Sequence, residues 1–299
     1  KKQALEWYEK ALTRLPDETK LREAAATRYW DVSYPLVDGK KYTESLPYLN
    51  RAIELKPNYV NPYNSRGIVY DELKQYEQAL ADYNRALALD PKFVNAYNNR
   101  GNTYSDLRQF EQALADYNSA LELDPKYFNA YNGRGGVYLI LKQYEQALAD
   151  YNRALELDPT FLYPYNNRGI IYLFLNDKER AIKDFQLNRN LNPLTIYPQL
   201  MVIWAKMSRE RPGLETAKQL DEAALVDPRH YGAYICRGIA LGLRGKIKEG
   251  LVEFERAIDL EPGEPFAYFW KGMLCAYYYR GRYQVAIEAI EKSLVIGDR

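Results

Sequence analysis

A 34-residue block occurs three times in succession between residues 60 and 161. Each copy carries a Tyr-Asn-x-Arg-Gly segment, a Glu-Gln-Ala-Leu-Ala-Asp-Tyr-Asn segment and an Asp-Pro pair in the same register. A fixed period of this length indicates a repeat architecture, in which each unit buries its apolar face by stacking on its neighbours. The length of 299 residues is therefore better read as a number of repeats than as a number of ordinary domains.

The spacing inside one block predicts two helices. Tyr97, Gly101 and Tyr104 lie three or four residues apart and share one face of a first helix, and Ala113 and Tyr117 share one face of a second. The glycine and the alanine allow close approach of the two helices, and the tyrosine rings fill the remaining space. The Asp-Pro pair ends the second helix, because the residue before a proline is disfavoured in the helical region.

These positions resemble the tetratricopeptide repeat, with its aromatic-x3-Gly-x2-Tyr, Ala-x3-aromatic and Pro pattern. The chain resembles a bacterial-type array of such repeats. The resemblance implies an all-α solenoid, a right-handed superhelix of antiparallel helix pairs. One departure is that arginine stands where the family usually places leucine, at Arg66, Arg100, Arg134 and Arg168.

We predict a single array over residues 1–299 with seventeen helices. Residues 1–16 resemble the second helix of a truncated repeat, and the full repeats follow at 17–59, 60–93, 94–127, 128–161, 162–195, 196–230, 231–264 and 265–299. The first of these runs 41 residues from Pro16 to Pro57, seven more than the period, and Pro35 to Lys41 is expected to form a longer loop. The start inside a repeat and the lack of a polar closing helix lead us to expect flanking domains.

Composition argues against several classes of function. Lys and Arg number 41 against 40 Asp and Glu, so no global field favours nucleic acid or an anionic membrane. No run of 18 apolar residues is present, so no membrane insertion is expected and we predict a cytoplasmic protein. Cys236 and Cys275 lie about one repeat apart and are expected in separate layers rather than in a disulfide.

Catalysis finds little support in the residues. His230 is the one histidine and falls in a turn between repeats. The stretch from Gly133 to Gly136 looks loosely like a phosphate loop, but Gly135 is the packing glycine of its repeat and lies inside a predicted helix. We find no zinc spacing and no nucleophile motif, so we predict that the chain is not an enzyme and takes no cofactor.

An arginine recurs at position 7 of the repeats, counted from their first residues. The repeats that have it also carry an acid at position 23, which gives the pairs Arg66 and Asp82, Arg100 and Asp116, Arg134 and Asp150, Arg168 and Asp184, and Arg237 and Glu253. The repeats 17–59 and 196–230 lack both residues. Because the arginine and the acid are present together and absent together, an ion pair within each repeat is favoured over a ligand contact. Lys271 faces Ala289 and is expected to be the unpaired exception.

Asparagine dominates the face of the first helices that is left over once packing positions are removed, and in the family this face lines the concave groove. An amide side chain both donates and accepts, so a row of them can satisfy the backbone of an extended peptide. The alternative is that these are ordinary solvated helix positions. The predicted partner-binding residues are Asn64, Asn95, Asn98, Asn99, Asn102, Asn129, Asn132, Asn166, Asn167, Leu139, Leu173 and Phe174.

Positions 12 and 13 change character along the chain, from Asp71-Glu72 and Ser105-Asp106 to Leu139-Ile140 and Leu173-Phe174. Either these residues face the groove and suit a ligand with a basic and a hydrophobic portion, or they pack against the next repeat.

The preferred function is a protein-interaction scaffold that binds a peptide or a partner segment. A carboxylate clamp of the type that grips chaperone C-termini is disfavoured, because Asn98, Asn129 and Asn132 occupy its matching positions and Gly133 stands where an arginine could. The groove is more similar to the asparagine-lined arrays of glycosyltransferases. Two alternatives stay open: the sensor or substrate-docking region of a larger signalling or defence enzyme, and a scaffold that self-associates through its ends.

Overall fold

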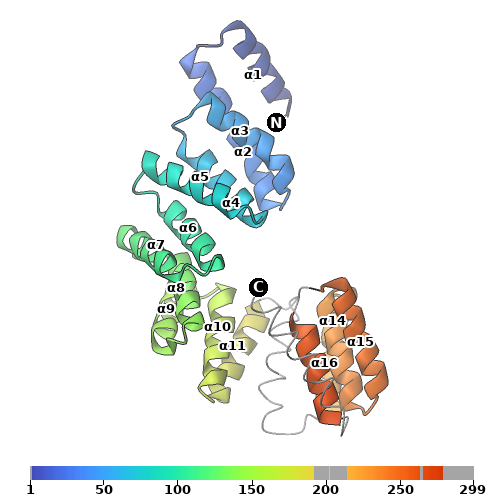
Figure 1. Cartoon of the computed structure of the whole chain (residues 1–299). Coiled ribbons are helices and arrows are strands. Elements are labelled where there is room, and N and C mark those ends of the chain that lie inside the picture. The colour runs from blue at the N-terminus through green and yellow to red at the C-terminus, as the bar shows by residue number, and fades with distance from the viewer. Residues whose placement is uncertain (1, 192–201, 203–213, 263–264, 279–299) are drawn as a thin grey trace. The chain divides into compact units, whose positions relative to one another are not determined.

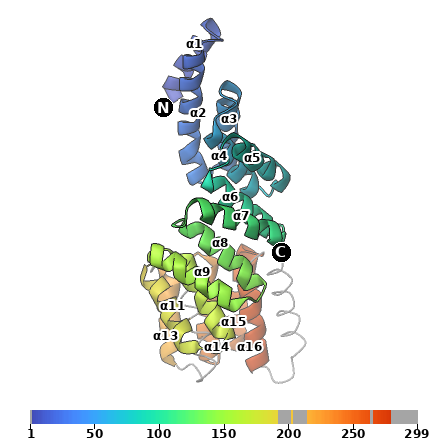
Figure 2. The same ribbon diagram turned by 90° about the vertical axis from the view of Figure 1, so that its left-hand side faces the viewer.

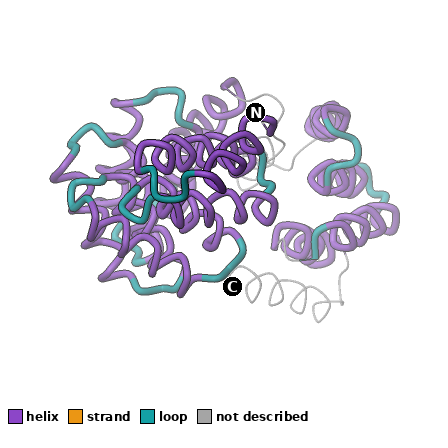
Figure 3. The backbone as a smooth tube through the Cα atoms, turned by 90° about the horizontal axis from the view of Figure 1, so that it is seen from above, coloured by secondary structure: helices purple, strands orange, loops and turns teal. Residues whose placement is uncertain are grey.

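The computed structural model describes residues 2–191, 202, 214–262 and 265–278 (Figure 1). The described residues form fifteen α-helices and contain no strand (Figure 3). The all-α fold built from packed helix pairs is therefore confirmed. The chain divides into two compact units, residues 1–159, named unit 1, and residues 160–299, named unit 2. Apart from residue 202, two of the seventeen predicted helices, the first of repeat 196–230 and the second of repeat 265–299, lie outside the described residues.

Unit 1 is a succession of helix pairs that contact one another in chain order (Figures 1 and 2). Its second helices pack on the first helices α2, α4, α6 and α8, and each of these first helices also contacts the next one along the unit. The bounds are α1 Lys2–Arg14, α2 Thr19–Asp38, α3 Tyr42–Leu55, α4 Val60–Glu72, α5 Tyr76–Leu89, α6 Val94–Asp106, α7 Phe110–Leu123, α8 Phe128–Ile140 and α9 Tyr144–Leu157.

Unit 2 begins with the pair α10 (Leu162–Phe174) and α11 (Lys178–Leu191). Its second described part consists of α13 (Leu214–Val226), α14 (Tyr231–Leu243), α15 (Ile247–Leu260) and α16 (Pro265–Tyr278), which contact one another in chain order. Leu220, Ile235 and Phe254 are fully buried in the core of this part. Cys236 and Cys275 are buried free thiols, as expected for residues in separate layers.

The seam inside each regular helix pair is a glycine packed on an aromatic ring. A Cβ atom added to Gly101 would lie 2.9 Å from Cε1 of Tyr117, and one added to Gly135 would lie 2.9 Å from Cε1 of Tyr151. Both rings are buried, and Ala113 beside the first is fully buried. Such distances exclude an ordinary side chain, which explains why glycine recurs at this position.

The prediction of a loop from Pro35 to Lys41 is wrong. Helix α2 has 20 residues against 13 in α4, and it contains Pro35 in its last turn. Proline loses one backbone donor, but its carbonyl still accepts the N–H of Gly39 at 3.1 Å. The extra residues thus lengthen the helix, where Val32 and Ser33 are buried, and the turn shrinks to residues 39–41.

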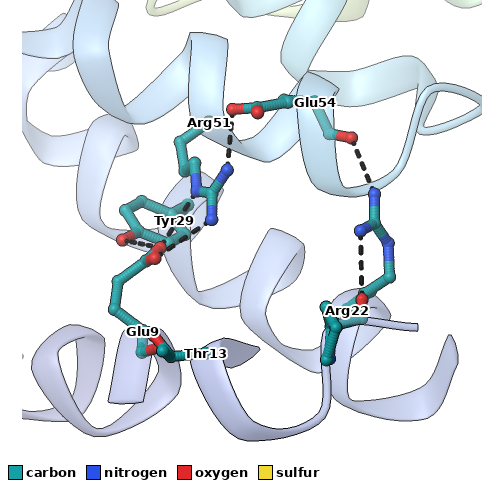
Figure 4. Close-up of polar contacts among 7 residues, drawn as sticks. Glu9, Thr13, Arg22, Tyr29, Arg51 and Glu54 are labelled. Atoms are coloured by element: carbon teal, nitrogen blue, oxygen red, sulfur yellow. Dashed lines mark hydrogen bonds and ion pairs between the residues drawn. The ribbon is translucent and has the colours of Figure 1, made fainter. Parts of the chain in front are cut away.

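A half-exposed polar cluster fastens the first three helices together (Figure 4). Arg51 on α3 donates from Nε and Nη2 to the two carboxylate oxygens of Glu9 on α1, both at 3.0 Å. Tyr29 on α2 donates its hydroxyl to the same carboxylate at 2.6 Å. The hydrogen bond from Arg51 lowers the pKa of Glu9, and burial raises the pKa of Tyr29 to about 12.

Candidate functional site

The predicted ion pairs within the repeats are confirmed. Arg66, Arg100 and Arg134 each donate from Nε and Nη2 to both oxygens of their own aspartate, over distances of 2.6 to 2.8 Å. Arg168 binds Asp184 in the same way in unit 2, and Arg237 donates from Nε to Glu253 at 2.9 Å. The aspartates are buried, so these bidentate pairs are structural.

The third guanidinium nitrogen of each regular pair, Nη1, binds an asparagine of the preceding repeat. Nη1 of Arg100 donates to Asn84 at 2.5 Å, and Nη1 of Arg134 donates to Asn118 at 2.6 Å. The guanidinium of Arg100 also lies 5.6 Å from the ring centroid of Tyr97. Each arginine therefore joins two successive repeats and has few donors left for a ligand.

Lys271 corrects the expectation of an unpaired cation. Its ammonium group donates to Glu255 on α15, sixteen residues earlier in the chain. Arg100 and Asn84 are separated by the same number of residues. Lys271 thus forms the contact with the preceding repeat, and its predicted neighbour Ala289 lies outside the described residues.

Asparagine at position 5 occupies the seam between neighbouring first helices. Asn64 on α4 and Asn98 on α6 are buried, with 8% and 5% of their surface exposed, and Asn132 on α8 is half-buried. Asn64 accepts from Asn99 at 3.1 Å, and Asn98 donates to Asn99 at 3.3 Å. The Oδ1 atoms of Asn98 and Asn132 are buried, and no donor among the described residues reaches them.

The asparagines at positions 2 and 9 are already engaged within the protein. Asn95 accepts from the hydroxyl of Tyr127 at 2.8 Å, and Asn102 accepts from the hydroxyl of Tyr117 at 2.7 Å. Asn129 also interacts with the hydroxyl of Tyr127 and moderates the rise in its pKa that burial causes. Part of the hydrogen-bonding capacity of each of these amides is therefore already used within the protein, and less of it is left for a ligand.

Position 6 is a contact between repeats. Asn99 donates across to Asn64, and at the same position on α4 Ser65 accepts from Nε1 of Trp30 at 3.1 Å. On α8 the residue is Gly133, where an added Cβ would lie 2.6 Å from Cε1 of Tyr117. An arginine therefore does not fit at Gly133, in agreement with the argument against a carboxylate clamp.

The C-terminal ends of the first helices carry the change from acidic to apolar residues. Glu72 on α4 and Asp106 on α6 are exposed, Leu139 is half-buried, and Ile140 on α8 is 54% exposed. Partial burial of its carboxyl group raises the pKa of Asp106, and burial raises that of Asp71 as well. In unit 1 the exposed members of positions 12 and 13 are therefore open to a partner.

Unit 2 holds the last predicted partner-binding residues on α10. Asn166 and Asn167 are half-buried, and Oδ1 of Asn166 is buried without a donor among the described residues. Leu173 is half-buried and Phe174 is 61% exposed. Asn166 thus has the same unsatisfied amide oxygen as its two equivalents in unit 1.

Ile140 belongs to this surface and the buried Thr103 hydrogen-bonds one of its residues, Asp71, but neither was among the predicted partner-binding residues. Thr103 is fully buried on α6 and donates to Asp71 on α4 at 2.7 Å, which orients that carboxylate. The equivalent residues in the neighbouring repeats are Val69 and Val137. The sequence could therefore have pointed to Thr103, because it is a polar residue at a repeat position that is apolar in the neighbouring repeats.

The residues that the sequence analysis considered for catalysis and phosphate binding have structural roles. His230 is the N-cap of α14, where its Nδ1 accepts from the N–H of Gly232 at 3.1 Å. Residues 133–136 lie inside helix α8. No cluster of three or more His, Cys, Asp or Glu side chains in the described ranges is placed to hold a metal ion. None of the described helices is long and apolar enough to cross a membrane.

Family models match the central part of the sequence. Models described as tetratricopeptide repeat match residues 94–127 and 128–161, and also 48–81 and 150–183, and a TPR repeat model matches residues 69–107. The comparison with curated proteins gives no match.

Solved structures share the fold at low sequence identity. A tetratricopeptide repeat protein from Parabacteroides merdae is 17% identical with a TM-score of 0.60, and the match covers 90% of this chain and 98% of that one. Yeast Tom70 is 21% identical with a TM-score of 0.61, over 99% of this chain and 59% of Tom70. Pseudomonas aeruginosa pilF is 16% identical with a TM-score of 0.56, over 82% of this chain and 96% of that one. The repeated sequence pattern and the family models, which match ranges between residues 48 and 183, show that the chain is a tetratricopeptide repeat protein, and the solved structures share its fold.

Proposed function

We propose that the chain is a protein-interaction scaffold and that unit 1 binds an extended peptide along α4, α6 and α8. The observation that carries this proposal is the pair of buried amide oxygens on Asn98 and Asn132, which no described residue satisfies. An unsatisfied buried acceptor costs about 1–3 kcal/mol. Because this loss of stability occurs at the same position of neighbouring repeats, it favours a functional role for the two asparagines over a chance feature of one repeat.

The spacing of the repeats suits an extended ligand. Packed helices lie roughly 8–10 Å apart, and a polyproline II segment repeats its orientation every three residues, or about 9.3 Å. A peptide in this conformation can therefore direct one backbone N–H toward each successive position-5 amide. Because such bonds involve the peptide backbone, they hold many different sequences.

The unsatisfied oxygens are closed to solvent in the unbound chain, so binding includes a movement of the amide. Asn132 is half-buried. A half-turn of its amide exchanges the positions of its oxygen and nitrogen, so that the acceptor takes the place of the donor. Asn98 is more deeply buried and requires a larger adjustment.

A random twelve-residue peptide library displayed on phage tests the proposal. Selection uses the wild-type chain, the double variant Asn98→Ala/Asn132→Ala, and the control Gln112→Ala/Gln146→Ala, which removes two exposed amides from the second helices of the same repeats. We expect the wild type and the control to bind the selected peptides equally and the asparagine variant to bind them at least tenfold more weakly, with its helical signal unchanged. Equal affinities for all three proteins, or no selected peptide, would contradict the proposal.

A further inference from the structure

The C-terminal ends of α4, α6 and α8 form a strip that the backbone contacts proposed above do not use. We name this strip the rim and define it as Asp71, Glu72, Asp106, Leu139 and Ile140. These residues occupy positions 12 and 13 of three successive repeats, and the first helices that carry them contact one another in order. The rim therefore runs across the same three helices as the proposed peptide.

The half of the rim on α4 and α6 is rich in hydrogen-bond acceptors. Asp71 accepts from buried Thr103 at 2.7 Å, while Glu72 and Asp106 are exposed. Lys74 is the cation that lowers the pKa of Asp71 and of Asp106 against the effect of burial, and its ammonium lies over the ring of Tyr76 at 5.7 Å. The rim thus has three carboxylates, and one ammonium group acts on two of them.

Among the described residues, the groups of the second helices that act on this half are tyrosine hydroxyls rather than cations, and Tyr42 on α3 hydrogen-bonds Glu72. The hydroxyls of Tyr83 on α5 and Tyr117 on α7 lie within the electrostatic field of the rim carboxylates, and Tyr117 already donates to Asn102. Asn98 shares one face of α6 with Asn102, because the two residues are four apart, and its buried oxygen also lacks a donor. A ligand that carries hydrogen-bond donors and positive charge would therefore complement this side of unit 1.

The half of the rim on α8 has the opposite character. Leu139 and Ile140 replace the polar residues Ser105 and Asp106 of the preceding repeat, and Ile140 leaves 54% of its surface exposed. Leu141 extends the exposed apolar surface, at 39% exposure. An aliphatic side chain placed here gains free energy by removing both apolar surfaces from water.

Charge complementarity and the repeat spacing together specify the occupant. One step between first helices is roughly 8–10 Å, which an extended chain covers in about three residues. We propose that the peptide bound by unit 1 carries a Lys or Arg side chain against Asp71 and Asp106 and, about three residues away, a large aliphatic side chain against Leu139 and Ile140. This inference rests on the proposed peptide-binding function and adds the chemical class of the ligand.

Four fluorescein-labelled, end-capped peptides of twelve residues test the inference by fluorescence anisotropy. Two contain an Arg pair and a Leu pair three residues apart in a Gly-Ser background, one in each order. The other two, built on the tighter-binding order, replace the Arg pair by Glu or the Leu pair by Ser. The proteins are the wild type, Glu72→Lys/Asp106→Lys and Ile140→Ser, which change exposed side chains and leave the Thr103–Asp71 bond intact.

We expect the wild type to bind the better Arg–Leu peptide at least tenfold more tightly than either replacement, with an affinity that falls as salt rises. The charge-reversed variant should prefer the Glu peptide, and Ile140→Ser should lose the preference for Leu while it keeps the preference for Arg. Equal binding of the Arg and Glu peptides, or no binding of any peptide, would overturn this inference. Library peptides that bind through Asn132 without the basic and aliphatic pattern would leave the peptide-binding proposal standing while this one fails.

Discussion

The first full repeat and the regular repeats of unit 1 solve the same packing problems with different residues. In the regular repeats a buried Arg–Asp pair and a glycine on a tyrosine ring hold the helix pair together. In the first repeat Val32 and Tyr48 replace the ion pair, and Ser33 and Leu49, both fully buried, replace glycine and tyrosine. Arg51 of this repeat instead pairs with Glu9 on α1, and this pair is more exposed than the Arg–Asp pairs.

The difference teaches that burial decides how much each polar contact matters. The side chain of Asp116 is 7% exposed in its pair with Arg100, whereas Glu9 is 41% exposed in its pair with Arg51. A buried pair leaves an uncompensated charge when one partner is removed, and an exposed carboxylate is screened by water. The regular repeats should therefore be sensitive to single changes that the first repeat tolerates.

The largest effect is expected from Asp116→Ala. The change leaves the guanidinium of Arg100, whose side chain is only 19% exposed, without its carboxylate, and we expect a loss of about 3 kcal/mol in the free energy of unfolding. Urea unfolding followed by circular dichroism measures it. The matched change Glu9→Ala should cost less than about 1 kcal/mol. Similar losses for the two variants would remove the basis of the comparison.

A double replacement separates charge burial from packing. Arg100→Leu together with Asp116→Leu removes both charges, and we expect a stability within about 1 kcal/mol of the wild type, since a buried ion pair can be exchanged for apolar residues at little cost. A double variant as unstable as Asp116→Ala would show that the pair itself supplies the stability.

The seam gives the next largest effect. Gly101→Ala places a Cβ atom 2.9 Å from the ring of Tyr117 and should destabilise by about 1–3 kcal/mol. At Gly136, where the nearest atom is 3.9 Å away, the same change should stabilise by about 0.5–1 kcal/mol. Gly101→Ser combined with Tyr117→Leu reproduces the first repeat and should recover most of the loss, as thermal melting would show. A double variant no better than Gly101→Ala would refute the equivalence of the two seams.

Asn132→Ala should raise stability by about 1 kcal/mol. The change removes an unsatisfied buried oxygen and introduces a better helix former. Asn64→Ala removes an acceptor used by Asn99 and should lower stability by about the same amount. Chemical denaturation of both variants measures the contrast. A destabilised Asn132→Ala would mean that its amide serves the fold and would weaken the case for a ligand.

The smallest effect is a pH dependence at the N-terminus. The folded-state pKa of Glu9 is lowered below its ordinary value of 4.5, so its contribution to stability is present above pH 4.5 and is lost as pH falls through the lowered value. Hydrogen exchange in α1 should be slower in the wild type than in Glu9→Gln at pH 6, and equal in the two at low pH. A difference that persists after Glu9 is protonated would assign the protection to packing.

Much of the fold was predictable because the sequence of each regular repeat determines its own helix pair. Gly101 and Tyr117 predicted the helix pair, and the joint presence of Arg100 and Asp116 predicted the ion pair. The first repeat was harder, because Pro35 looked like a turn residue while the packing of Val32 and Ser33 kept the helix continuous.

The candidate site was less predictable than the fold. The sequence pattern placed the asparagines on one helix face, but it could not show that Tyr117 and Tyr127 already donate to Asn102 and Asn95. Those bonds depend on the distance between neighbouring helices, which the period of a sequence does not give. The twelve predicted partner-binding residues remain a proposal. Among them, Asn98 and Asn132 have the strongest physical argument for ligand binding, because their buried amide oxygens lack a donor among the described residues.

The central claim is that unit 1 holds its ligand on the first helices. Hydrogen–deuterium exchange of the chain, with and without a peptide selected from the library, tests it most directly. We expect slower exchange on binding in α4, α6 and α8, and unchanged exchange in the second helices α5, α7 and α9. Protection confined to the second helices would contradict the account and place the ligand on the opposite side of the helix pairs.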